Sequence, residues 1–416
     1  MKKPRILFPW MILIILLNGC CKNNEPVYNP VTNGEIRIGA LLSLTGSGYS
    51  TGQSSQVSIE LAQHDIAGYM NQLAIEKKVT VEVLDTKTDT AEALKQLKVL
   101  YDKGIRLVIG PYTSAELAAI KPFADSHGIL VISPSSVAVS LAIPNDNVFR
   151  FVSSDVLQGK AMTKMLIEDQ VKVIVPLVRD DVWGRDLLAS TRRDFMAAGS
   201  KVRTPVMYSP KTTDFIPLLS KLDSNVAAEL NLYDPGEVAV YLVSLSEGSG
   251  FLHDALEKVN LNKVFWYGSS AFAQNASMLT DTTAASYACA HGLPCPIFGL
   301  DDAAKDKWQP LSDRIQLQIG HVPDSYAFTA YDALWVSVLS YLKAGESPDI
   351  EFLKLVFTLE SSGYFGASGN TSLDVNGDRA VGNYDFWAVK RGSNGYAWQK
   401  VAKYNSATDQ LTRLEK

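Results

Sequence analysis

Apolar positions along most of the chain follow two alternating patterns. Residues 36–44 and 79–84 are nearly continuous apolar runs, typical of strands that are buried on both faces of a parallel sheet. Between them, Ile59, Ala62 and Ile66 recur at spacings of three and four, as on one face of a helix. The pattern predicts a strand, a helix and a second strand in succession.

The same alternation continues through two cycles. Thr113 and Glu116 have the spacing of a capping box, which predicts a helix start after the strand at 105–109. After Phe149 the pattern restarts, with predicted strands that include 171–178. Two cycles of about 120 residues each indicate two similar α/β lobes, and repeated strand–helix–strand units favour parallel sheets with helices on both faces.

The N-terminus has the pattern of an export signal. Basic residues precede an apolar run at 6–17, which is too short to span a bilayer comfortably. The run ends in LNGC, which resembles the lipobox of bacterial lipoproteins and implies lipidation of Cys20. We predict a signal peptide at 1–19, a lipid-anchored linker at 20–34, and an extracytoplasmic, membrane-anchored protein in the periplasm or on the cell surface. An uncleaved signal anchor is the alternative.

Charge then limits the function classes. The chain has 416 residues and a formal net charge of −5 from 39 basic and 44 acidic side chains. Removal of residues 1–19 takes away three basic groups, which leaves 36 basic against 44 acidic residues, a net charge of −8. No long basic run occurs, so we expect no nucleic-acid partner.

A glycine-rich turn after the first predicted strand suggests a nucleotide site at first sight. Gly46, Gly48 and Gly52 do not have the GxGxxG spacing, and no acidic residue follows about 20 residues later at the end of a second strand. We therefore expect no cofactor. A turn that directs backbone amides into a cleft is the favoured interpretation.

An acidic segment near the C-terminus partly imitates a calcium loop. Asp374, Asn376 and Asp378 alternate, but Arg379 occupies the position where the sharp turn needs glycine. Asn376 followed by Gly377 is also the commonest pair in a type I′ hairpin turn. We predict a hairpin and no metal.

Two cysteines and one glycine–serine segment are the candidates for reactive chemistry. Cys289 and Cys295 lie close in sequence, and a local disulfide is the default in an oxidising compartment. A zinc site needs a further ligand that is not nearby in sequence. Gly268, Ser269 and Ser270 do not form a GxSxG elbow. We expect a disulfide and no enzymatic activity.

Five segments, in consistent order, carry a family resemblance. They are 36–52 (IRIGALLSLTGSGYSTG), 107–114 (LVIGPYTS), 128–136 (GILVISPSS), 331–333 (YDA) and 373–379 (LDVNGDR). Together they resemble the leucine/isoleucine/valine-binding protein family, the extracytoplasmic solute receptors of ABC transporters. The resemblance implies a type I periplasmic-binding fold, an α/β fold in which two Rossmann-like lobes with parallel sheets are joined by three crossovers.

The resemblance also implies lobes that are discontinuous in sequence. Lobe one is expected to comprise 35–152 and 286–346, and lobe two 153–285 and 347–416. The predicted hairpin at Asn376 and Gly377 then falls among the final strands of lobe two.

Ligand-binding residues of lobe one are implied by position. In the family, a serine and backbone groups of this lobe hold the carboxylate or amide end of the ligand. The matching residues are Ser114 with Tyr112 beside it, and Ser135 with Val137. Ser114 lies at a predicted helix N-terminus, which favours an anionic or carbonyl oxygen, although Thr113 and Ser114 could serve only to cap the helix. Thr51 and Tyr49 lie on the first loop, which faces the cleft in the family.

Lobe two contributes Trp183 and Ser270 by the same reasoning. Trp183 matches an aromatic residue that closes over the ligand, or it is a core residue at a helix start. Ser270 stands where amino-acid binders place an acidic residue against the ligand's ammonium. Because a buried ammonium needs a counter-charge or several acceptors, an α-amino acid is not expected unless Asp180 or Asp181 substitutes. Val137 likewise replaces a frequent threonine.

These observations predict a solute-binding lipoprotein of an ABC transporter. The expected ligand is a small polar molecule, amino-acid-like, an amide or related, and the expected partners are a membrane permease and the membrane itself through the lipid anchor. We expect a monomer. A ligand sensor that signals to a membrane receptor is the alternative, and an exported hydrolase that uses Ser270 or Ser114 is less favoured because no base accompanies either serine.

Overall fold

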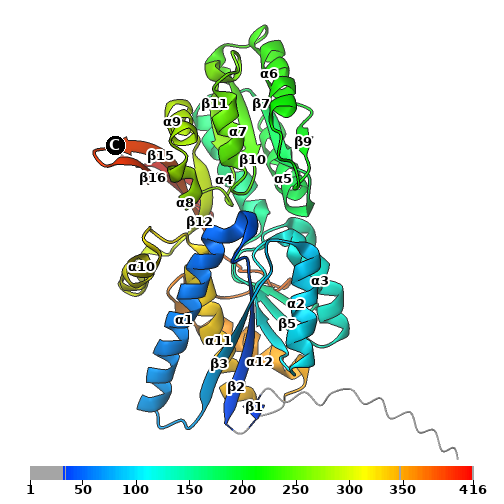
Figure 1. Cartoon of the computed structure of the whole chain (residues 1–416), viewed down its shortest axis with the longest axis vertical. Coiled ribbons are helices and arrows are strands. Elements are labelled where there is room, and N and C mark those ends of the chain that lie inside the picture. The colour runs from blue at the N-terminus through cyan, green and yellow to red at the C-terminus, as the bar shows by residue number, and fades with distance from the viewer. Residues whose placement is uncertain (1–30, 33, 346–347, 415–416) are drawn as a thin grey trace, which may run out of the picture.

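The computed structural model describes residues 31–32, 34–345 and 348–414. The predicted signal peptide, Cys20 and most of the predicted linker lie outside the described residues. Two lobes are stacked along the long axis of the molecule (Figure 1). We call the lobe that contains the N-terminal strands lobe one, and the other lobe two.

Lobe one is built on a parallel sheet with the strand order β3-β2-β4-β5-β6, and β1 adds antiparallel to the start of β2. The bounds of the strands are β1 Val31–Thr32, β2 Glu35–Leu42, β3 Lys78–Asp85, β4 Leu107–Ile109, β5 Leu130–Ser133 and β6 Val148–Arg150. The helices are η1 Gly46–Gly48, α1 Tyr49–Gln72, α2 Thr90–Asp102, α3 Ser114–Ser126, η2 Val139–Leu141, α10 Lys305–Ile319, α11 Tyr326–Ala344 and α12 Ile350–Gly363.

The alternation of side chains along these strands gives the sheet two buried faces. Leu41, Val108 and Val131 form one cluster with α2 and α3. Their neighbours in sequence, such as Leu107 and Leu130, form another cluster with α1, α11 and α12. Strands that are apolar on both faces therefore became the central layer, as predicted.

Lobe two repeats this plan with the parallel order β11-β10-β7, and both β8 and β9 pair with β7. The strands are β7 Val173–Arg179, β8 Lys201–Val202, β9 Val206–Tyr208, β10 Val238–Val243 and β11 Phe265–Gly268. The helices are α4 Asp155–Glu168, α5 Val182–Ala197, α6 Ile216–Leu230, η3 Pro235–Glu237, α7 Gly248–Ala255, η4 Leu261–Lys263, α8 Ala276–Thr280 and α9 Thr282–His291.

An antiparallel sheet extends lobe two. Its order is β12-β15-β16-β17, and the β15–β16 hairpin projects from the molecule (Figure 1). Phe386 and Tyr404 of this sheet are buried in the same core cluster as Val175 and Val240 of the parallel sheet. The strands are β12 Cys295–Gly299, β15 Asn383–Gly392, β16 Gly395–Asn405 and β17 Gln410–Arg413, and the remaining short elements are η5 Asp302–Ala304, β13 Phe365–Gly366 and β14 Gly369–Asn370.

The chain passes between the lobes three times: after β6, after β12, and before β15. The predicted fold class is therefore confirmed, with two α/β lobes and three crossovers. The packing differs from the expected segment boundaries in two places. Strand β12 belongs to the lobe-two sheet, although 286–346 was assigned to lobe one. Leu353 and Phe357 of α12 pack with the lobe-one core, although 347–416 was assigned to lobe two.

Asn376 and Gly377 form a turn, as predicted. The type of the turn and its position in the fold differ from the prediction. Leu373 and Arg379 form an antiparallel bridge, and the Gly377 amide donates to the Asp374 carbonyl at 3.1 Å. Of the predicted pair only Gly377 has a positive φ, 76°, so the turn is not type I′. The Arg150 amide donates to the Gly377 carbonyl, so the turn packs against lobe one and does not form the final strands of lobe two.

The predicted disulfide is not formed, because both Cys289 and Cys295 are free thiols. The Cys295 thiol begins a strand and donates to the Leu293 carbonyl at 3.4 Å. It also lies so close to Gly268 that a β-carbon there would approach the sulfur to 2.3 Å, so it points into the sheet of lobe two. Burial raises the pKa of this thiol.

Neither a metal cluster nor a membrane span is found in the described part of the chain. No group of three or more His, Cys, Asp or Glu side chains there could hold a metal ion. No helix over the same residues is long and apolar enough to cross a membrane.

Candidate ligand-binding site

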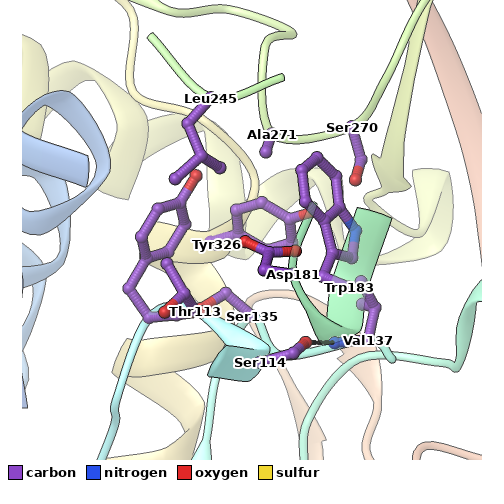
Figure 2. Close-up of a pocket in the computed structure, with 11 residues that line it drawn as sticks. Thr113, Ser114, Ser135, Val137, Asp181, Trp183, Leu245, Ser270, Ala271 and Tyr326 are labelled. Atoms are coloured by element: carbon purple, nitrogen blue, oxygen red, sulfur yellow. Dashed lines mark hydrogen bonds between the residues drawn. The ribbon is translucent and has the colours of Figure 1, made fainter. Parts of the chain in front are cut away.

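A pocket lies between the two lobes and is lined by both (Figure 2). The space between its lining atoms, counting the solvent at its mouth, is about 340 Å³. The lining residues from lobe one are Tyr112, Thr113, Ser114, Ser135, Val137 and Tyr326, and those from lobe two are Asp181, Trp183, Leu245, Ser270 and Ala271.

Most of these residues follow the carboxyl ends of parallel strands. Residues 112–114 come after β4 and 135–137 after β5, while Asp181 and Trp183 come after β7. Leu245 and Ser270 follow β10 and β11. The carboxyl edge is where open α/β sheets bind ligands, and here two such edges face each other.

Ser114 organises the lobe-one wall. Its hydroxyl oxygen accepts hydrogen bonds from the Val137 amide at 3.2 Å, the Ala138 amide at 3.1 Å and the Ser136 hydroxyl at 2.9 Å. Donors from the loop after β5 occupy the acceptor sites of this oxygen. Ser114 can therefore offer a ligand only its hydroxyl hydrogen, as a donor. The Val137 amide is likewise held by Ser114, whereas the sequence suggested it as a ligand contact.

Thr113 caps the helix that Ser114 begins. Its hydroxyl accepts from the Glu116 amide at 3.2 Å, and the Glu116 carboxylate accepts from the Thr113 amide at 3.0 Å. The predicted capping box is therefore present. Because Thr113 provides the cap, Ser114 is not needed for it and can serve the pocket.

Aromatic rings form much of the remaining wall. Tyr112 and Tyr326 meet edge to face, with ring centroids 6.4 Å apart, and Ser135 donates from its hydroxyl to the Tyr112 carbonyl at 2.9 Å. Burial raises the pKa of both phenols, which therefore stay neutral hydrogen-bonding groups at physiological pH. Trp183, at the start of α5, is 5% exposed and lies on the opposite side of the pocket (Figure 2).

Buried charges support the lobe-two wall. Asp181 accepts the Gly184 amide at 2.9 Å, which caps α5, and also the Arg179 guanidinium at 2.7 Å. Arg179 donates to Glu247 as well, at 2.7 Å. Burial lowers the pKa of Arg179, but Glu247 and Asp181 more than offset this and raise it. Arg179 therefore remains charged and fixes both carboxylates.

Ser270 lies at the inner end of the same wall. Its amide donates to the Gln158 side-chain oxygen at 2.8 Å, and Gln158 donates to the Asp155 carboxyl group. The Ser270 hydroxyl is buried and near the Tyr326 phenol, yet it completes no hydrogen bond with the residues that the structure describes. It is available to a ligand.

The structure brings six of the eight ligand-binding candidates into this pocket: Tyr112, Ser114, Ser135, Val137, Trp183 and Ser270. Thr51 is not a lining residue, but its side chain lies near the Tyr112 phenol and partly offsets the rise in the pKa of that group. Tyr49 is 52% exposed and lines a separate groove at the cleft mouth. Asp181 lines the pocket and Asp180 does not.

Sequence reasoning missed Thr113, Leu245, Ala271 and Tyr326. Leu245 ends the apolar run that begins at Val238, and this was an available signal, because the end of a parallel strand marks the same sheet edge as Ser270. Tyr326 starts a helix that arrives late in the sequence, and no local pattern links it to the cleft.

Direct hydrogen bonds join the lobes beside the pocket. The Ser140 amide of lobe one donates to the Asp186 carboxylate of lobe two at 2.7 Å. The Ala276 amide of lobe two donates to the Ser50 hydroxyl of lobe one at 3.3 Å. The lobes are therefore in contact, as in a closed cleft.

The arrangement is that of a two-lobed binding protein. The chain belongs to the periplasmic binding protein family, whose model matches residues 35–395. Membership implies an extracytoplasmic location and a role in binding rather than catalysis. The resemblance to the leucine/isoleucine/valine-binding proteins is thereby confirmed.

Individual relatives agree with this assignment. An uncharacterised protein of Methanocaldococcus jannaschii is 27% identical, over 95% of this chain and 96% of its own. The leucine-, isoleucine-, valine-, threonine- and alanine-binding protein of Pseudomonas aeruginosa is 24% identical over 88% and 91%. Among solved structures, the leucine-binding protein LivK of Thermotoga maritima has a TM-score of 0.74 at 20% identity, covering 89% of this chain and 99% of its own.

Proposed function

We propose that this protein is the lipid-anchored solute receptor of an ABC transporter, which captures a small polar molecule, amino-acid-like or related, and delivers it to a membrane permease. The observation that carries the proposal is the pocket whose walls come from both lobes. A ligand that touches both walls stabilises the closed form more than the open form, and this difference drives closure.

The chemistry of the walls supports a ligand of this class. The pocket offers a hydroxyl donor at Ser114, a carboxylate at Asp181, and aromatic surface at Tyr112 and Trp183. This combination suits a small molecule with a polar head and a compact apolar part. The names of the Pseudomonas aeruginosa and Thermotoga maritima relatives, which refer to amino acids, point in the same direction.

A thermal-shift panel tests the binding role. Amino acids, amides, urea, aromatic acids and nucleosides are each added to the purified protein. A ligand present at 100 times its Kd adds about 2.7 kcal/mol to the free energy of unfolding, so a true ligand raises Tm by several degrees. The matched control is Trp183→Ala, in which the same ligand should give a smaller shift. If no class of compound shifts Tm, the binding role is rejected.

Delivery and anchoring have separate tests. The ligand-loaded protein should stimulate ATP hydrolysis by its permease complex in proteoliposomes, whereas binding without stimulation would favour the sensor role. Incorporation of labelled palmitate in cells, lost in Cys20→Ser, tests the anchor. Palmitate labelling that persists in Cys20→Ser would show that the anchor is elsewhere.

A further inference from the structure

A second pocket lies between the lobes, next to the crossover that follows β12. Its lobe-two side includes Phe298 of β12 and Trp387 of β15, and its lobe-one side includes Trp308 of α10 and Phe328 of α11. Helix α10 and the β15–β16 hairpin lie on the same side of the molecule (Figure 1). The space between the lining atoms, counting the solvent at the mouth, is about 540 Å³. We call this the hinge pocket; it has no described lining residue in common with the ligand-binding pocket.

One polar side chain of the hinge pocket is buried without a partner. Ser325 lines the pocket and is 5% exposed, and its hydroxyl oxygen has no hydrogen-bond partner among the described residues. It stands at the N-cap of α11, but its side chain makes no capping hydrogen bond. Buried polar groups are normally hydrogen-bonded. The free hydroxyl of Ser325 therefore indicates an occupant that bonds it.

The charged side chains of the hinge pocket are already paired. Asp385 pairs with Lys400, and Asp302 accepts from Lys403 at 2.6 Å. These pairs include every Asp, Glu, Lys, Arg and His side chain among the described lining residues. An occupant with a net charge would find no free counter-charge there, and burial of an unpaired charge is costly. The lining therefore favours a neutral occupant.

Aromatic side chains stand on both sides of the hinge pocket. Trp308 and Phe328 belong to a hydrophobic cluster of lobe one, whereas Phe298 and Trp387 belong to the core of lobe two. Contacts between aromatic rings add to the free energy gained from burial of apolar surface. Together with the hydroxyl of Ser325, these rings suit a small neutral aromatic compound that carries a hydroxyl or N–H group.

Two segments of the chain contribute to both pockets. Ser270 lines the ligand-binding pocket, and Gln274, four residues later, lines the hinge pocket. Tyr326 lines the ligand-binding pocket, and its neighbour Ser325 lines the hinge pocket. A compound in the hinge pocket thus contacts both lobes and also the segments that form the ligand-binding pocket.

We propose that the hinge pocket is a second binding site of this protein, for a small neutral aromatic compound with a hydroxyl or N–H group that bonds Ser325. Because such a compound contacts both lobes, it stabilises the arrangement in which they are in contact. It thereby couples its own binding to closure of the cleft. The inference goes beyond the receptor role and does not depend on which molecule the ligand-binding pocket takes.

A variant that fills the hinge pocket tests its location, with 4-methylphenol as the probe in calorimetric titrations. Val322 lines the pocket and is 49% exposed, so Val322→Trp adds an indole ring without disturbing a core and should abolish binding. Leu317→Trp is the matched control, at a position of α10 that is 87% exposed and outside the pocket, and should bind as the parent does. Absence of binding to the parent, or equal binding to Val322→Trp, overturns the site.

A further variant distinguishes the two pockets. Trp183→Ala changes the ligand-binding pocket and not the hinge pocket, so it should keep the parent's affinity for 4-methylphenol. Loss of binding in Trp183→Ala would place the probe in the ligand-binding pocket and would overturn the proposal.

Charged analogues and Ser325→Ala test the ligand class. 4-Methylbenzoate and 4-methylbenzylammonium are titrated into the parent and into Val322→Trp, and only binding that the variant loses is counted. By this measure 4-methylphenol should bind about tenfold more tightly than either ion, or better. The ratio of affinities for 4-methylphenol and toluene should fall about threefold or more in Ser325→Ala. An ion that binds equally well, or an unchanged ratio in Ser325→Ala, overturns the ligand class.

Small-angle X-ray scattering tests the coupling to closure. Saturation with 4-methylphenol should reduce the radius of gyration of the parent protein and leave that of Val322→Trp unchanged. An unchanged radius in the parent overturns the coupling. These outcomes are distinguishable from failure of the proposed function, because the thermal-shift panel with Trp183→Ala reports on the other pocket.

Discussion

The two walls of the pocket are built by different means. The lobe-one wall is neutral and local: Ser114, Ser136 and Val137 hydrogen-bond one another across two loops that follow adjacent strands. The lobe-two wall depends on charge and on distant residues, since Arg179 and Glu247 are 68 positions apart. The lobe-one wall is thus held by hydrogen bonds between neighbouring loops, whereas the lobe-two wall depends on ion pairs between residues that are distant in sequence.

The largest expected effect comes from removing the cation of the lobe-two wall. Arg179→Met leaves Asp181 and Glu247 buried without their shared counter-charge, and such a change typically costs about 3–5 kcal/mol of stability. The free energy of unfolding from urea denaturation measures this loss. The matched control is Arg185→Met, which breaks the exposed pair with Asp180 and should cost at most about 1 kcal/mol. Equal losses in the two variants would contradict the account of this wall.

A smaller loss is expected in the lobe-one wall. Ser114→Ala removes the acceptor of three donors, two of them backbone amides. A buried donor without a partner costs about 1–3 kcal/mol, and water that enters the pocket can satisfy part of this demand. We expect a loss of stability in that range by urea denaturation, together with weaker ligand binding. Ser136→Ala, which removes a donor and leaves Ser114 in place, should lose about 1 kcal/mol or less.

The smallest effect is expected at Asp155, which is linked to Ser270 of the lobe-two wall through the side chain of Gln158. Burial raises the pKa of Asp155 well above its usual range, and Oδ2 has no partner among the described residues. Because the folded state then binds the proton more tightly than the unfolded state, Asp155 reduces stability as pH rises above the unfolded pKa of about 4. Asp155→Asn should be more stable than the parent by about 1 kcal/mol near pH 8.

The pH dependence of that difference is the useful measurement. Urea denaturation from pH 4 to pH 8 should show the two proteins converging at the acid end and separating as pH rises. Asp180→Asn serves as the control, because its exposed carboxylate should give a difference that changes little with pH. A constant gap between Asp155→Asn and the parent would show that Asp155 stays ionised in the folded protein.

Local sequence patterns predicted the lobe-one wall well. Its strands are continuous apolar runs and its helix start is a capping box, whereas Ser114 and Ser135 were assigned to the site by the family resemblance. The partnership of Arg179 with Glu247 had no such signal, because each follows a different strand and only the packing of the β7–β10 pair brings them together. Sequence patterns within about twenty residues identify single helices and strands. Contacts between elements that are distant in sequence become known only from the three-dimensional fold.

The predictions that differ from the structure failed for the same reason, because they depend on contacts between elements that are distant in sequence. The spacing of Cys289 and Cys295 permitted a disulfide, but α9 ends between them and β12 points the second thiol at Gly268. Asn376 and Gly377 were correctly taken as a turn, but the surface against which the turn packs is not encoded in the pair. Likewise, the boundary at residue 347 came from the family resemblance, which did not show that α12 packs on lobe one.

The contacts between the lobes affect the rate at which a bound molecule dissociates. Ser140 with Asp186, and Ala276 with Ser50, join the two lobes without any ligand atom. Escape of a bound molecule requires these bonds to break first, so they lengthen its residence time even though they add nothing to its recognition. In the transport role that we propose, a permease surface that competes for the same groups would shorten this residence time.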